Sequence, residues 1–347
     1  MTFRERFMNH EAEFDEIFDL TDQWNFSDET CTLREFLGLN AEEEDIWISE
    51  SDDALEQFME QERKKQTANA TNYKEAHINM NPKIFFTDLD GTLLNDHQEI
   101  TAGNRAAISD ALAAGHKIVI ATGRPLASAS IQAERLGLIS EGCYAITYNG
   151  GLIYDSFHQK VLRGTSVPKE LLAPIFAGAH AMDIHIHTYS DTHILSEYET
   201  PQLLEYSATT LLPWKIVSSI EQAGDFTPYK MLAISNHEKL LAFQQELQSR
   251  YSGILESFFS CDVLLEIVPS GISKGFAVKW MCNYLGIPLV NSVAAGDAQN
   301  DIPMLEAAHI GAVMANALPE IASHGNYVTT ADNNHDGVAE IIRKFIL

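Results

Sequence analysis

The stretch from Ile84 to Leu94, IFFTDLDGTLL, decides how the chain is interpreted. Its first residues are apolar on both faces of an extended chain, which predicts a buried central strand. Asp88 and Asp90 follow where that strand ends, and ligands bind at the carboxyl ends of strands in open α/β sheets. Residues two apart on a strand point to one side, so we expect both carboxylates to face one crevice.

Two carboxylates in one crevice repel each other unless a cation lies between them or one of them holds a proton. Both conditions suit phosphoryl transfer, in which a metal ion neutralises charge, one carboxylate attacks phosphorus and the second acid protonates the leaving oxygen. Alone, the pair is weak evidence for such a site and also fits a loop in which one carboxylate caps the next turn. Further motifs in the sequence are needed to choose between a phosphoryl-transfer site and a capped loop.

Strand and helix signals alternate after this stretch. They predict a helix over 101–114, a strand over 118–121, a helix over 126–136 and a strand over 144–147. From residue 264 the alternation returns, with a helix over 274–285, a strand over 293–295, a helix over 302–308, a strand over 310–313 and a last helix from 338. Repeated strand–helix units predict a parallel sheet with right-handed crossovers.

The middle of the chain follows a different pattern. Two short strands are expected within 151–163, then a helix from Pro168 and an alternating segment from Asp183 to Tyr189. The predicted fold class is therefore α/β, with a Rossmann-like parallel-sheet core over 81–165 and 263–347 and an inserted α/β domain over 166–262.

Other polar residues also follow predicted strands or open predicted helices. Thr122, Gly123 and Arg124 come after the strand over 118–121 and offer a hydroxyl and backbone N–H groups to phosphate oxygens. Lys274 opens a helix, and both the N-terminus of that helix and the ammonium group of the lysine favour a nearby anion. Taken singly, these features also fit an ordinary turn and a solvated lysine.

Carboxylates recur near the end of the chain. Asp297 and Asp301 follow the apolar strand over 293–295. Hard divalent cations prefer oxygen ligands of this kind, although either residue alone also fits a helix cap. Together with Asp88 and Asp90, they predict a metal site where several strands end.

The four motifs, in this order, resemble those of the haloacid dehalogenase superfamily, and specifically its Cof-like phosphatases, which carry a large cap between the second and third motifs. The motifs are DxDGT from Asp88, TGRP from Thr122, GxSKG from Gly271 and GDxxND from Gly296. The resemblance covers residues 83–347. The second acid, Asp90, points to phosphate ester chemistry, because dehalogenases and phosphonatases of the superfamily lack an aspartate at that position.

The resemblance implies catalytic and metal-binding roles. Asp88 would be the nucleophile that forms an aspartyl phosphate, and Asp90 the general acid and later the base that activates water. Mg²⁺ would be the cofactor, held by Asp88, Asp297 and the backbone carbonyl of Asp90, with Asp301 in or just behind the first coordination shell.

The resemblance also implies phosphate ligands. Thr122, Gly123 and Lys274 would hold the phosphate, with Arg124 and Asn300 as second-rank candidates. A further motif, from Asn149 to Gly151, resembles the Asn-Gly-Ala of Cof-like members, whose asparagine approaches the substrate phosphate; glycine at 151 is a mild departure.

Composition excludes some partners and compartments. The chain has 347 residues, with 49 Asp and Glu against 23 Lys and Arg and a net charge of −26, which disfavours nucleic acid and anionic lipid. No run approaches the ~18 apolar residues of a membrane helix, the N-terminus is too acidic for a targeting peptide, and the four cysteines form no CxxC pair. We expect a cytoplasmic enzyme without a nucleic-acid or membrane partner.

Residues 1–80 lie outside the resemblance. They hold 21 Asp and Glu against 7 Lys and Arg, and short helices are expected there, one opened by a capping box from Thr32 to Glu35. Candidates for a minimal core are Trp24, Phe26, Leu37 and Trp47. The segment is expected to be either a solvated helical appendage or a docking module whose acidic face binds a basic protein partner.

The predicted function is a Mg²⁺-dependent phosphatase of small phosphorylated metabolites, with sugar phosphates first and pyridoxal phosphate or flavin mononucleotide next. The alternatives are a phosphatase dedicated to one sugar phosphate, of the sucrose- or trehalose-phosphate type, and a regulatory protein acting through residues 1–80. Within the insert, His185 and His187 share one face of a predicted strand, where they are either packing residues or ligands of a metal or an anionic substrate.

Overall fold

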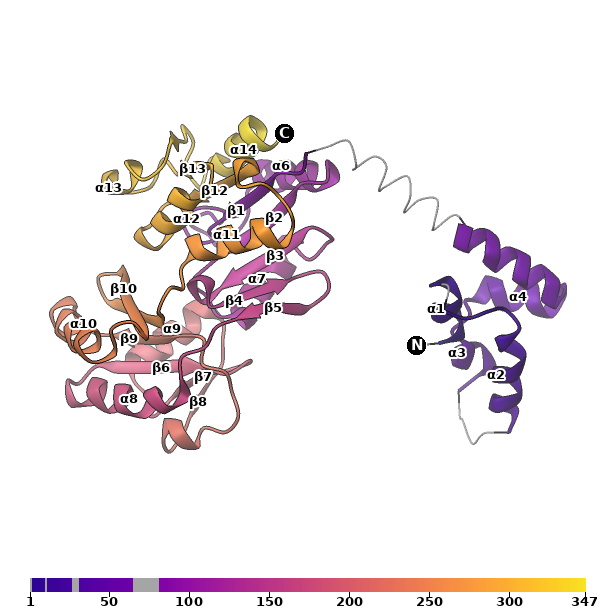
Figure 1. Ribbon diagram of the computed structural model, residues 1–347, viewed down its shortest axis with the longest axis horizontal. Coiled ribbons are helices and arrows are strands. Elements are labelled where there is room, and N and C mark those ends of the chain that lie inside the picture. Colours follow the sequence, from indigo (N-terminus) through magenta and orange to yellow (C-terminus); the bar gives the residue numbers. More distant parts are fainter. Residues whose placement is uncertain (1, 10, 27–30, 65–80) are drawn as a thin grey trace. The chain divides into compact units, whose positions relative to one another are not determined.

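The computed structural model describes the whole chain except residues 1, 10, 27–30 and 65–80 (Figure 1). The chain divides into two compact units, Met1–Met80 and Asn81–Leu347. In the described parts of both units, no helix is long and apolar enough to cross a membrane.

The first unit is helical. Its helices are α1 (Phe3–Met8), α2 (Glu16–Asn25), α3 (Leu33–Leu37) and α4 (Ala41–Ser49), and residues 52–64 are helical too. α3 begins at the predicted capping box, in which Thr32 and Glu35 satisfy each other's backbone N–H groups. The unit has its own apolar core, formed by Phe3, Phe7, Ala12, Phe14, Ile17, Leu37, Leu39, Leu55 and Met59.

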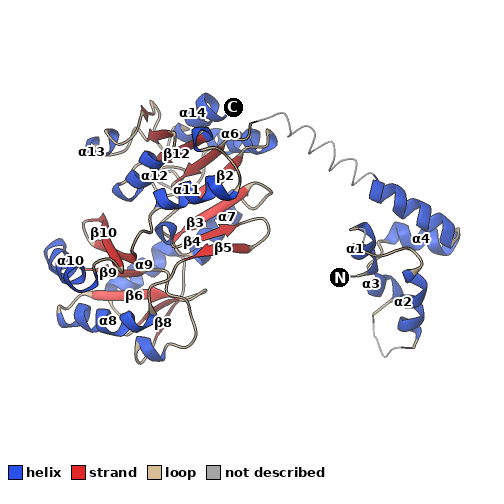
Figure 2. Ribbon diagram, viewed as in Figure 1, coloured by secondary structure: helices blue, strands red, loops and turns tan. Residues whose placement is uncertain are grey.

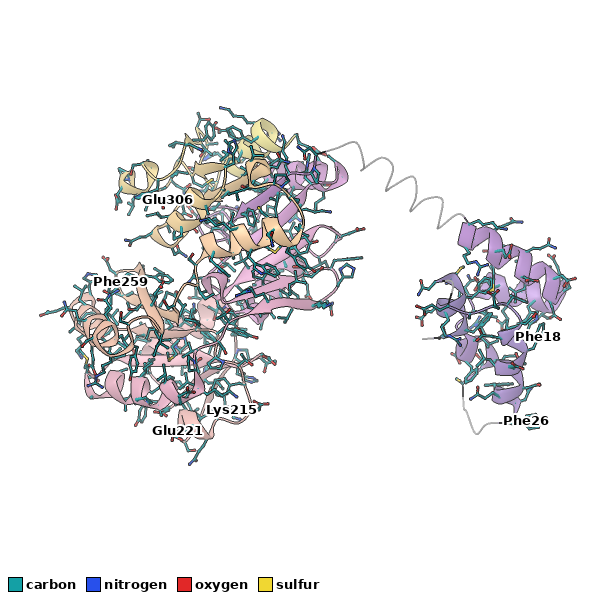
Figure 3. All side chains as sticks on the ribbon, viewed as in Figure 1. Phe18, Phe26, Lys215, Glu221, Phe259 and Glu306 are labelled. Carbon is teal, nitrogen blue, oxygen red and sulfur yellow. The ribbon has the colours of Figure 1, made fainter. Side chains whose placement is uncertain are left out.

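The expected core of this unit was only partly right. Leu37 lies in the core and Trp47 packs against it. Phe26 is wrong, because its side chain comes one residue after α2 ends and is 91% exposed (Figure 3). The phenylalanines of α1 and the segment before α2 fill the core instead.

The second unit is built on an eight-stranded sheet in the order β14-β13-β12-β1-β2-β3-β4-β5. Its strands are β1 (Ile84–Thr87), β2 (Lys117–Ala121), β3 (Cys143–Thr147), β4 (Leu152–Asp155), β5 (Lys160–Gly164), β12 (Ser292–Gly296), β13 (Ile310–Val313) and β14 (Tyr327–Val328). Neighbours from β14 to β3 are parallel, and β4 and β5 pair antiparallel. The predicted parallel-sheet core is confirmed.

Helices cover both faces of this sheet (Figure 2). They are α6 (Ala102–Ala113), α7 (Leu126–Leu136), α11 (Lys274–Tyr284), α12 (Ile302–Ala307), α13 (Pro319–Ala322) and α14 (Gly337–Ile341), with short helical turns η1 (Tyr148–Gly150), η4 (Leu289–Asn291), η5 (Gln299–Asp301) and η6 (Ile342–Ile346). Phe85 packs with residues of α6, α7 and α14, whereas Ile84 and Phe86 pack with α11 and α12. Alternate side chains of the IFF run therefore fill opposite layers, which explains why β1 is apolar on both faces.

A second, six-stranded sheet is inserted between β5 and α11, in the order β10-β11-β9-β6-β7-β8. Its elements are β6 (His185–Tyr189), β7 (Ile194–Ser196), β8 (Trp214–Ile216), β9 (Met231–Ile234), β10 (Leu255–Cys261) and β11 (Leu264–Pro269), with helices η2 (Lys169–Leu171), α8 (Leu172–Ala181), α9 (Pro201–Thr210), η3 (Ile220–Gln222) and α10 (His237–Tyr251). We call residues 166–269 the cap.

The insert ends later than the residue 262 that the sequence indicated. β11 pairs with β9 and β10, so it belongs to the cap sheet and not to the returning core. Its run LLEIVP has the apolar character of a buried parallel strand. β11 resembles a buried core strand in sequence because it has a neighbouring strand on each side and packs Leu265 and Ile267 against the cap core.

We predict that alanine at Gly275 destabilises the protein while alanine at Gly178 stabilises it. A Cβ at Gly275 in α11 would overlap the carbonyl oxygen of Pro303, so the helices would have to separate, at a cost of about 1–3 kcal/mol. Gly178 in α8 has its nearest atoms at 3.6 Å, so alanine there should add about 0.5–1 kcal/mol through helix propensity. Urea unfolding of both variants measures the difference, and equal effects would contradict the close approach of α11 and α12.

Candidate active site

Three neighbouring strands of the core end at the same place. Asp88 follows β1, Thr122 follows β2 and Asp297 follows β12, and these strands are adjacent in the order β12-β1-β2. The ladder continues one residue past β1, since the N–H of Asp88 donates to the carbonyl oxygen of Ala295 at 3.0 Å. The predicted site residues therefore meet at the carboxyl edge of the sheet, where α/β folds bind ligands.

Lys274 lies between two of the carboxylates. Its Nζ donates to Oδ1 of Asp88 and to Oδ1 of Asp301, each at 2.6 Å, and all three residues are buried. Burial acts to lower the pKa of Lys274, but Asp301 and Asp88 outweigh it and raise the pKa above its usual range. The ammonium therefore stays charged and joins two carboxylates that are 213 residues apart in sequence.

The loop after β1 is shaped around Asp297. Gly91 has a φ of +77°, and a Cβ there would lie 2.5 Å from Oδ2 of Asp297, so the turn requires glycine. The hydroxyl of Thr92 donates to Oδ1 of Asp297 at 2.6 Å. Thr92 stands inside the DxDGT motif but was not among the predicted site residues.

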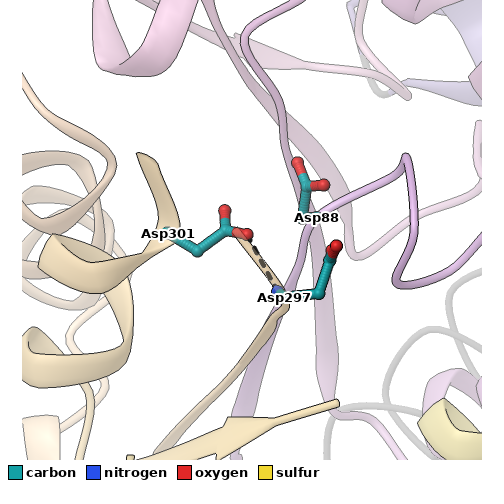
Figure 4. Close-up of side chains that lie close together, drawn as sticks. All are labelled: Asp88, Asp297 and Asp301. Atoms are coloured by element: carbon teal, nitrogen blue, oxygen red, sulfur yellow. Dashed lines mark hydrogen bonds between the residues drawn. The ribbon is translucent and has the colours of Figure 1, made fainter. Parts of the chain in front are cut away.

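Asp301 is held from the other side. Its Oδ2 accepts hydrogen bonds from the backbone N–H groups of Asp297 at 3.0 Å and Ala298 at 3.1 Å, and the first of these is drawn in Figure 4. Since its Oδ1 accepts from Lys274, both oxygens of Asp301 have partners. This carboxylate is fully buried and organises the loop after β12.

Asp88, Asp297 and Asp301 form a group that could hold a metal ion. Each offers one oxygen, and these oxygens lie within 4.8 Å of one another. Burial raises the pKa of Asp88 above its usual range; Lys274 opposes this shift, and Asp301 and Asp297 add to it. Burial likewise raises the pKa of Asp297 to about 6. The carboxylates are crowded enough to gain from a cation.

The charge balance and donor set fit a divalent cation. Four carboxylates gather here, those of Asp88, Asp90, Asp297 and Asp301, while Lys274 and Arg124 supply two positive charges. When all four carboxylates are ionised, two negative charges remain uncompensated, which equals the charge of one hard divalent ion with oxygen ligands.

Arg124 binds Asp90. Its Nε donates to Oδ2 at 2.8 Å and its Nη2 to Oδ1 at 2.6 Å, so the planar guanidinium grips the carboxylate through two parallel bonds. Nη2 also donates to Oε1 of Gln98 at 2.9 Å. The Asp90 side chain stays 45% exposed, which leaves it accessible from the crevice.

The loops after β3 and β12 each bring an amide side chain to the site, those of Asn149 and Asn300. Tyr148 and Asn149 both have positive φ, 52° and 57°, a conformation that costs energy outside glycine and that concentrates at functional sites. Nδ2 of Asn300 donates to Oδ1 of Asn149 at 3.3 Å. Nδ2 of Asn149 is buried and has no hydrogen-bond partner among the described residues, so this donor is available to a ligand.

Two cavities open between the core and the cap beside these residues. One, of about 320 Å³, reaches from Lys274, Asn149 and Asn300 to a cap wall formed by Gln244, Glu256, Ser257, Phe258 and Phe259. The other, of about 690 Å³, lies beside Asp297 and is bounded by the β10–β11 turn and by residues 316–324. The first cavity adjoins the candidate phosphate ligands and is the candidate substrate pocket.

His185 and His187 are packing residues of the cap. Nδ1 of His185 bonds to the Thr200 hydroxyl, its Nε2 to Nδ1 of His187, and Nε2 of His187 to the Tyr189 hydroxyl, at 2.9–3.0 Å. Burial lowers the pKa of His185 to about 4 and that of His187 well below its usual range. Both rings are neutral at pH 7 with all four nitrogens engaged, which favours the packing interpretation over metal or anion binding.

Comparison with known proteins agrees with this geometry. Residues 85–342 match a model of haloacid dehalogenase-like hydrolases. The chain belongs to the haloacid dehalogenase-like hydrolase family. The resemblance found in the motifs is therefore confirmed.

Individual relatives extend along most of the chain. YxeH of Bacillus subtilis (strain 168) is 31% identical over 275 residues, 76% of this chain and 98% of its own. HMP-PP phosphatase of Serratia proteamaculans (strain 568) is 29% identical over 237 residues, 68% of this chain and 85% of its own. A haloacid dehalogenase-like hydrolase from Bacteroides thetaiotaomicron superposes with a TM-score of 0.71 at 27% identity, over 76% of this chain and 99% of that one.

These relationships identify the chain as a phosphoric monoester hydrolase of the haloacid dehalogenase-like family. Members of this family generally use a divalent metal, and the aspartate group described above fits one. The family relationship starts at residue 85, so the helical first unit lies outside it.

We predict that the metal-free protein loses stability as the pH rises through the titration of Asp297. Its pKa is about 6 in the folded chain against an ordinary value of 3.8. Between these values the folded state binds more protons than the unfolded state, so the free energy of unfolding falls as the pH rises. Urea unfolding in EDTA from pH 4 to 7 measures this slope.

Asp297→Asn should flatten that slope, and Asp183→Asn, at an exposed cap residue, should leave it unchanged. Adding a divalent cation at pH 7 should restore more stability to the wild type than to Asp297→Asn, because binding to the folded state stabilises it. An identical slope in Asp297→Asn would contradict the assignment.

Proposed function

We propose that the chain is a Mg²⁺-dependent phosphatase of small phosphorylated metabolites that works through a phosphate ester on Asp88. The observation that carries the proposal is the buried Asp88 carboxylate, bound by Lys274 at 2.6 Å at the end of β1, with a second, accessible acid two residues later. One carboxylate is sheltered and oriented by a cation, and the other can reach solvent and substrate. This division of roles suits a nucleophile and a general acid.

The first step is an attack of an Asp88 oxygen on phosphorus. A bond forms between that oxygen and phosphorus, the bond to the leaving oxygen breaks, and Asp90 gives the leaving oxygen its proton. In the second step Asp90 takes a proton from water, the water oxygen attacks phosphorus, and the bond to Asp88 breaks to release phosphate. The bidentate contact with Arg124 orients Asp90 and favours its ionised form, which is the form that takes the proton from water in the second step; the first step uses the protonated form.

The other site residues hold the phosphate and the cofactor. Thr122, Gly123, Lys274 and Asn149 are proposed phosphate ligands, with Asn300 bonded to Asn149; Arg124 is a weaker candidate, since its guanidinium is committed to Asp90. Asp88, Asp297, Asp301 and the backbone carbonyl of Asp90 are the proposed ligands of Mg²⁺. When bound, the ion would neutralise charge on the phosphate and on these carboxylates.

Sugar phosphates are the proposed first substrate class. The wall of the 320 Å³ cavity combines the amides of Gln244 and Gln299, the Ser257 hydroxyl and the Glu256 carboxylate with two phenylalanines. Such a wall offers hydrogen bonds to a polyol and a flat surface to a ring. Pyridoxal phosphate and flavin mononucleotide remain candidates, and HMP-PP enters the panel because a relative is named for it.

Two alternatives remain testable. A phosphatase dedicated to one sugar phosphate would show a narrow substrate profile, whereas a general one would show a broad profile. For residues 1–80 we propose a docking role toward a basic protein, supported by their 21 Asp and Glu against 7 Lys and Arg. Deleting them should abolish capture of such a partner and leave turnover unchanged; loss of the fold would assign them a structural role.

We predict that phosphate release requires both Mg²⁺ and Asp88. The purified protein is incubated with sugar phosphates, pyridoxal phosphate, flavin mononucleotide and HMP-PP, in Mg²⁺ or EDTA. Asp88→Asn should abolish release because it removes the nucleophile, while Asp183→Asn should keep it. Release by Asp88→Asn at the wild-type rate would refute the mechanism.

Asp90→Asn separates the two steps. With p-nitrophenyl phosphate, whose leaving group needs little protonation, attack by Asp88 should continue while the water in the second step lacks its base. The phosphorylated protein should then accumulate and be detected by mass spectrometry after acid quenching. Full turnover without accumulation would assign the second acid elsewhere.

We predict discrimination against substrates with a second phosphate. Glu256 lines the substrate cavity, so a second anion there would be repelled. Fructose 6-phosphate should have a severalfold higher kcat/KM than fructose 1,6-bisphosphate, and Glu256→Gln should narrow the ratio. Glu238→Gln, on the exposed first turn of α10, should leave it unchanged.

A further inference from the structure

A buried ion pair of the cap contacts the phosphate-binding loop of the core. Lys230, immediately before β9, and Glu266, in β11, lie 2.6 Å apart, and their side chains are 1% and 6% exposed. The Nζ of Lys230 also donates to the carbonyl oxygen of Gly123 at 2.7 Å. Gly123 follows Thr122 in the loop after β2, so a cation of the cap binds the loop proposed to hold phosphate.

This contact is transmitted to Thr122 through one peptide plane. The carbonyl of Gly123 and the N–H of Arg124 belong to the same rigid peptide unit. That N–H donates to Oγ1 of Thr122 at 3.1 Å. Because Oγ1 accepts this bond, its own hydrogen is left to donate to a phosphate oxygen. Lys230 therefore acts on one end of a unit whose other end orients the Thr122 hydroxyl.

The backbone around Lys230 is itself fixed against both domains. The hydroxyl of Thr188 donates to the carbonyl oxygen of Lys230 at 2.8 Å within the cap sheet. The preceding ring, Tyr229, contacts the ring of Tyr148 in the core, with centroids 5.3 Å apart. Tyr148 adjoins Asn149, so the two residues of this cap segment touch both loops that carry candidate phosphate ligands.

Stability alone gives a weak reason for burying these charges. Removing a lysine and a glutamate from water costs free energy that their attraction often fails to recover, and apolar replacements of such pairs are frequently neutral or stabilising. Burial acts to lower the pKa of Lys230, but Glu266 and Tyr206 raise it above its usual range, so the lysine keeps its charge. A charged donor then remains available to the Gly123 carbonyl.

We propose that Lys230, held by Glu266, is a positioning residue that orients the Thr122 hydroxyl through the Gly123–Arg124 peptide, so that phosphate binding depends on the seated cap. This inference rests on the proposed function in taking Thr122 as a phosphate ligand. Lys230 itself touches neither Asp88 nor the metal ligands in the contacts described for it. Its effect is expected on binding of the phosphate group more than on the chemical step.

The test is a double-mutant cycle between Lys230 and Thr122. Lys230→Met/Glu266→Leu removes both buried charges together, so it avoids leaving Glu266 buried and unpaired. KM and the calorimetric Kd for inorganic phosphate should rise by between about ten- and a hundredfold, with kcat changed less. In a Thr122→Val background the same double substitution should have little further effect, because the hydroxyl that it orients is gone.

Controls separate positioning from loss of structure. Urea unfolding should show the double variant close to the wild type in stability. Lys239→Met, at a half-buried lysine of the cap whose ammonium pairs with the exposed Asp183, should leave KM and Kd unchanged. Lys230→Gln/Glu266→Gln, which keeps a donor at residue 230 but removes both charges, is measured in the same cycle, so the result does not depend on the Met/Leu variant folding.

Additive effects with Thr122→Val, or KM and Kd within about twofold of the wild type, would overturn the proposal. The phosphate titration does not require turnover. If the wild type released no phosphate from any substrate, the proposed function would fail, while the calorimetric cycle would still decide the role of Lys230.

Discussion

The buried contact of Lys274 with Asp88 and Asp301 is the interaction on which the site depends. Four carboxylates converge where three strands end, and like charges at such short range would separate without compensation. One ammonium group, 2.6 Å from two of them, keeps the loops after β1 and β12 together. Lys274 is the first residue of α11, so the start of that helix is fixed where the chain returns from the cap.

The inserted cap follows from the same constraint. β1 and β12 are adjacent in the sheet although they are separated by some 200 residues, and all of the cap lies between them in sequence. The cap can therefore vary without disturbing the register of β1 with β12 and β2. It leaves the core after β5 and returns just before Lys274, which places its second connection to the core beside the lysine that binds Asp88.

The sequence predicted the core well because its signals are local. Apolar runs too short for a helix and polar residues at strand ends are features of a few consecutive residues. These signals located β1, α7 and α11 within a residue or two and placed Asp88, Thr122 and Asp297 at one sheet edge. The end of the cap was misjudged because β11 is as apolar as a core strand, and only its pairing with β9 and β10 reveals its sheet.

Contacts between distant segments were beyond local signals. That His185 and His187 share one face of β6 follows from their spacing, but their bond to each other and the contact of His185 with Thr200, the N-cap of α9, depend on the folded cap. The bond from Lys230 to Gly123 joins residues 107 apart, and in sequence Lys230 is an unremarked lysine before a strand. Its burial beside Glu266 is what distinguishes it.

The two buried lysines of the second unit answer different physical needs. Lys274 compensates carboxylates that the chemistry requires, so its charge balances others in the same crevice. Lys230 compensates a single glutamate that no site residue requires, and the two charges could be removed together without leaving either unpaired. The Lys230–Glu266 pair balances no other charge, and Lys230 also donates to the loop after β2 that is proposed to hold phosphate. Positioning of that loop therefore explains the pair better than a contribution to the stability of the fold does. The proposed role of Lys230 would make the cap contribute to binding of the phosphate group, through its contact with the loop after β2.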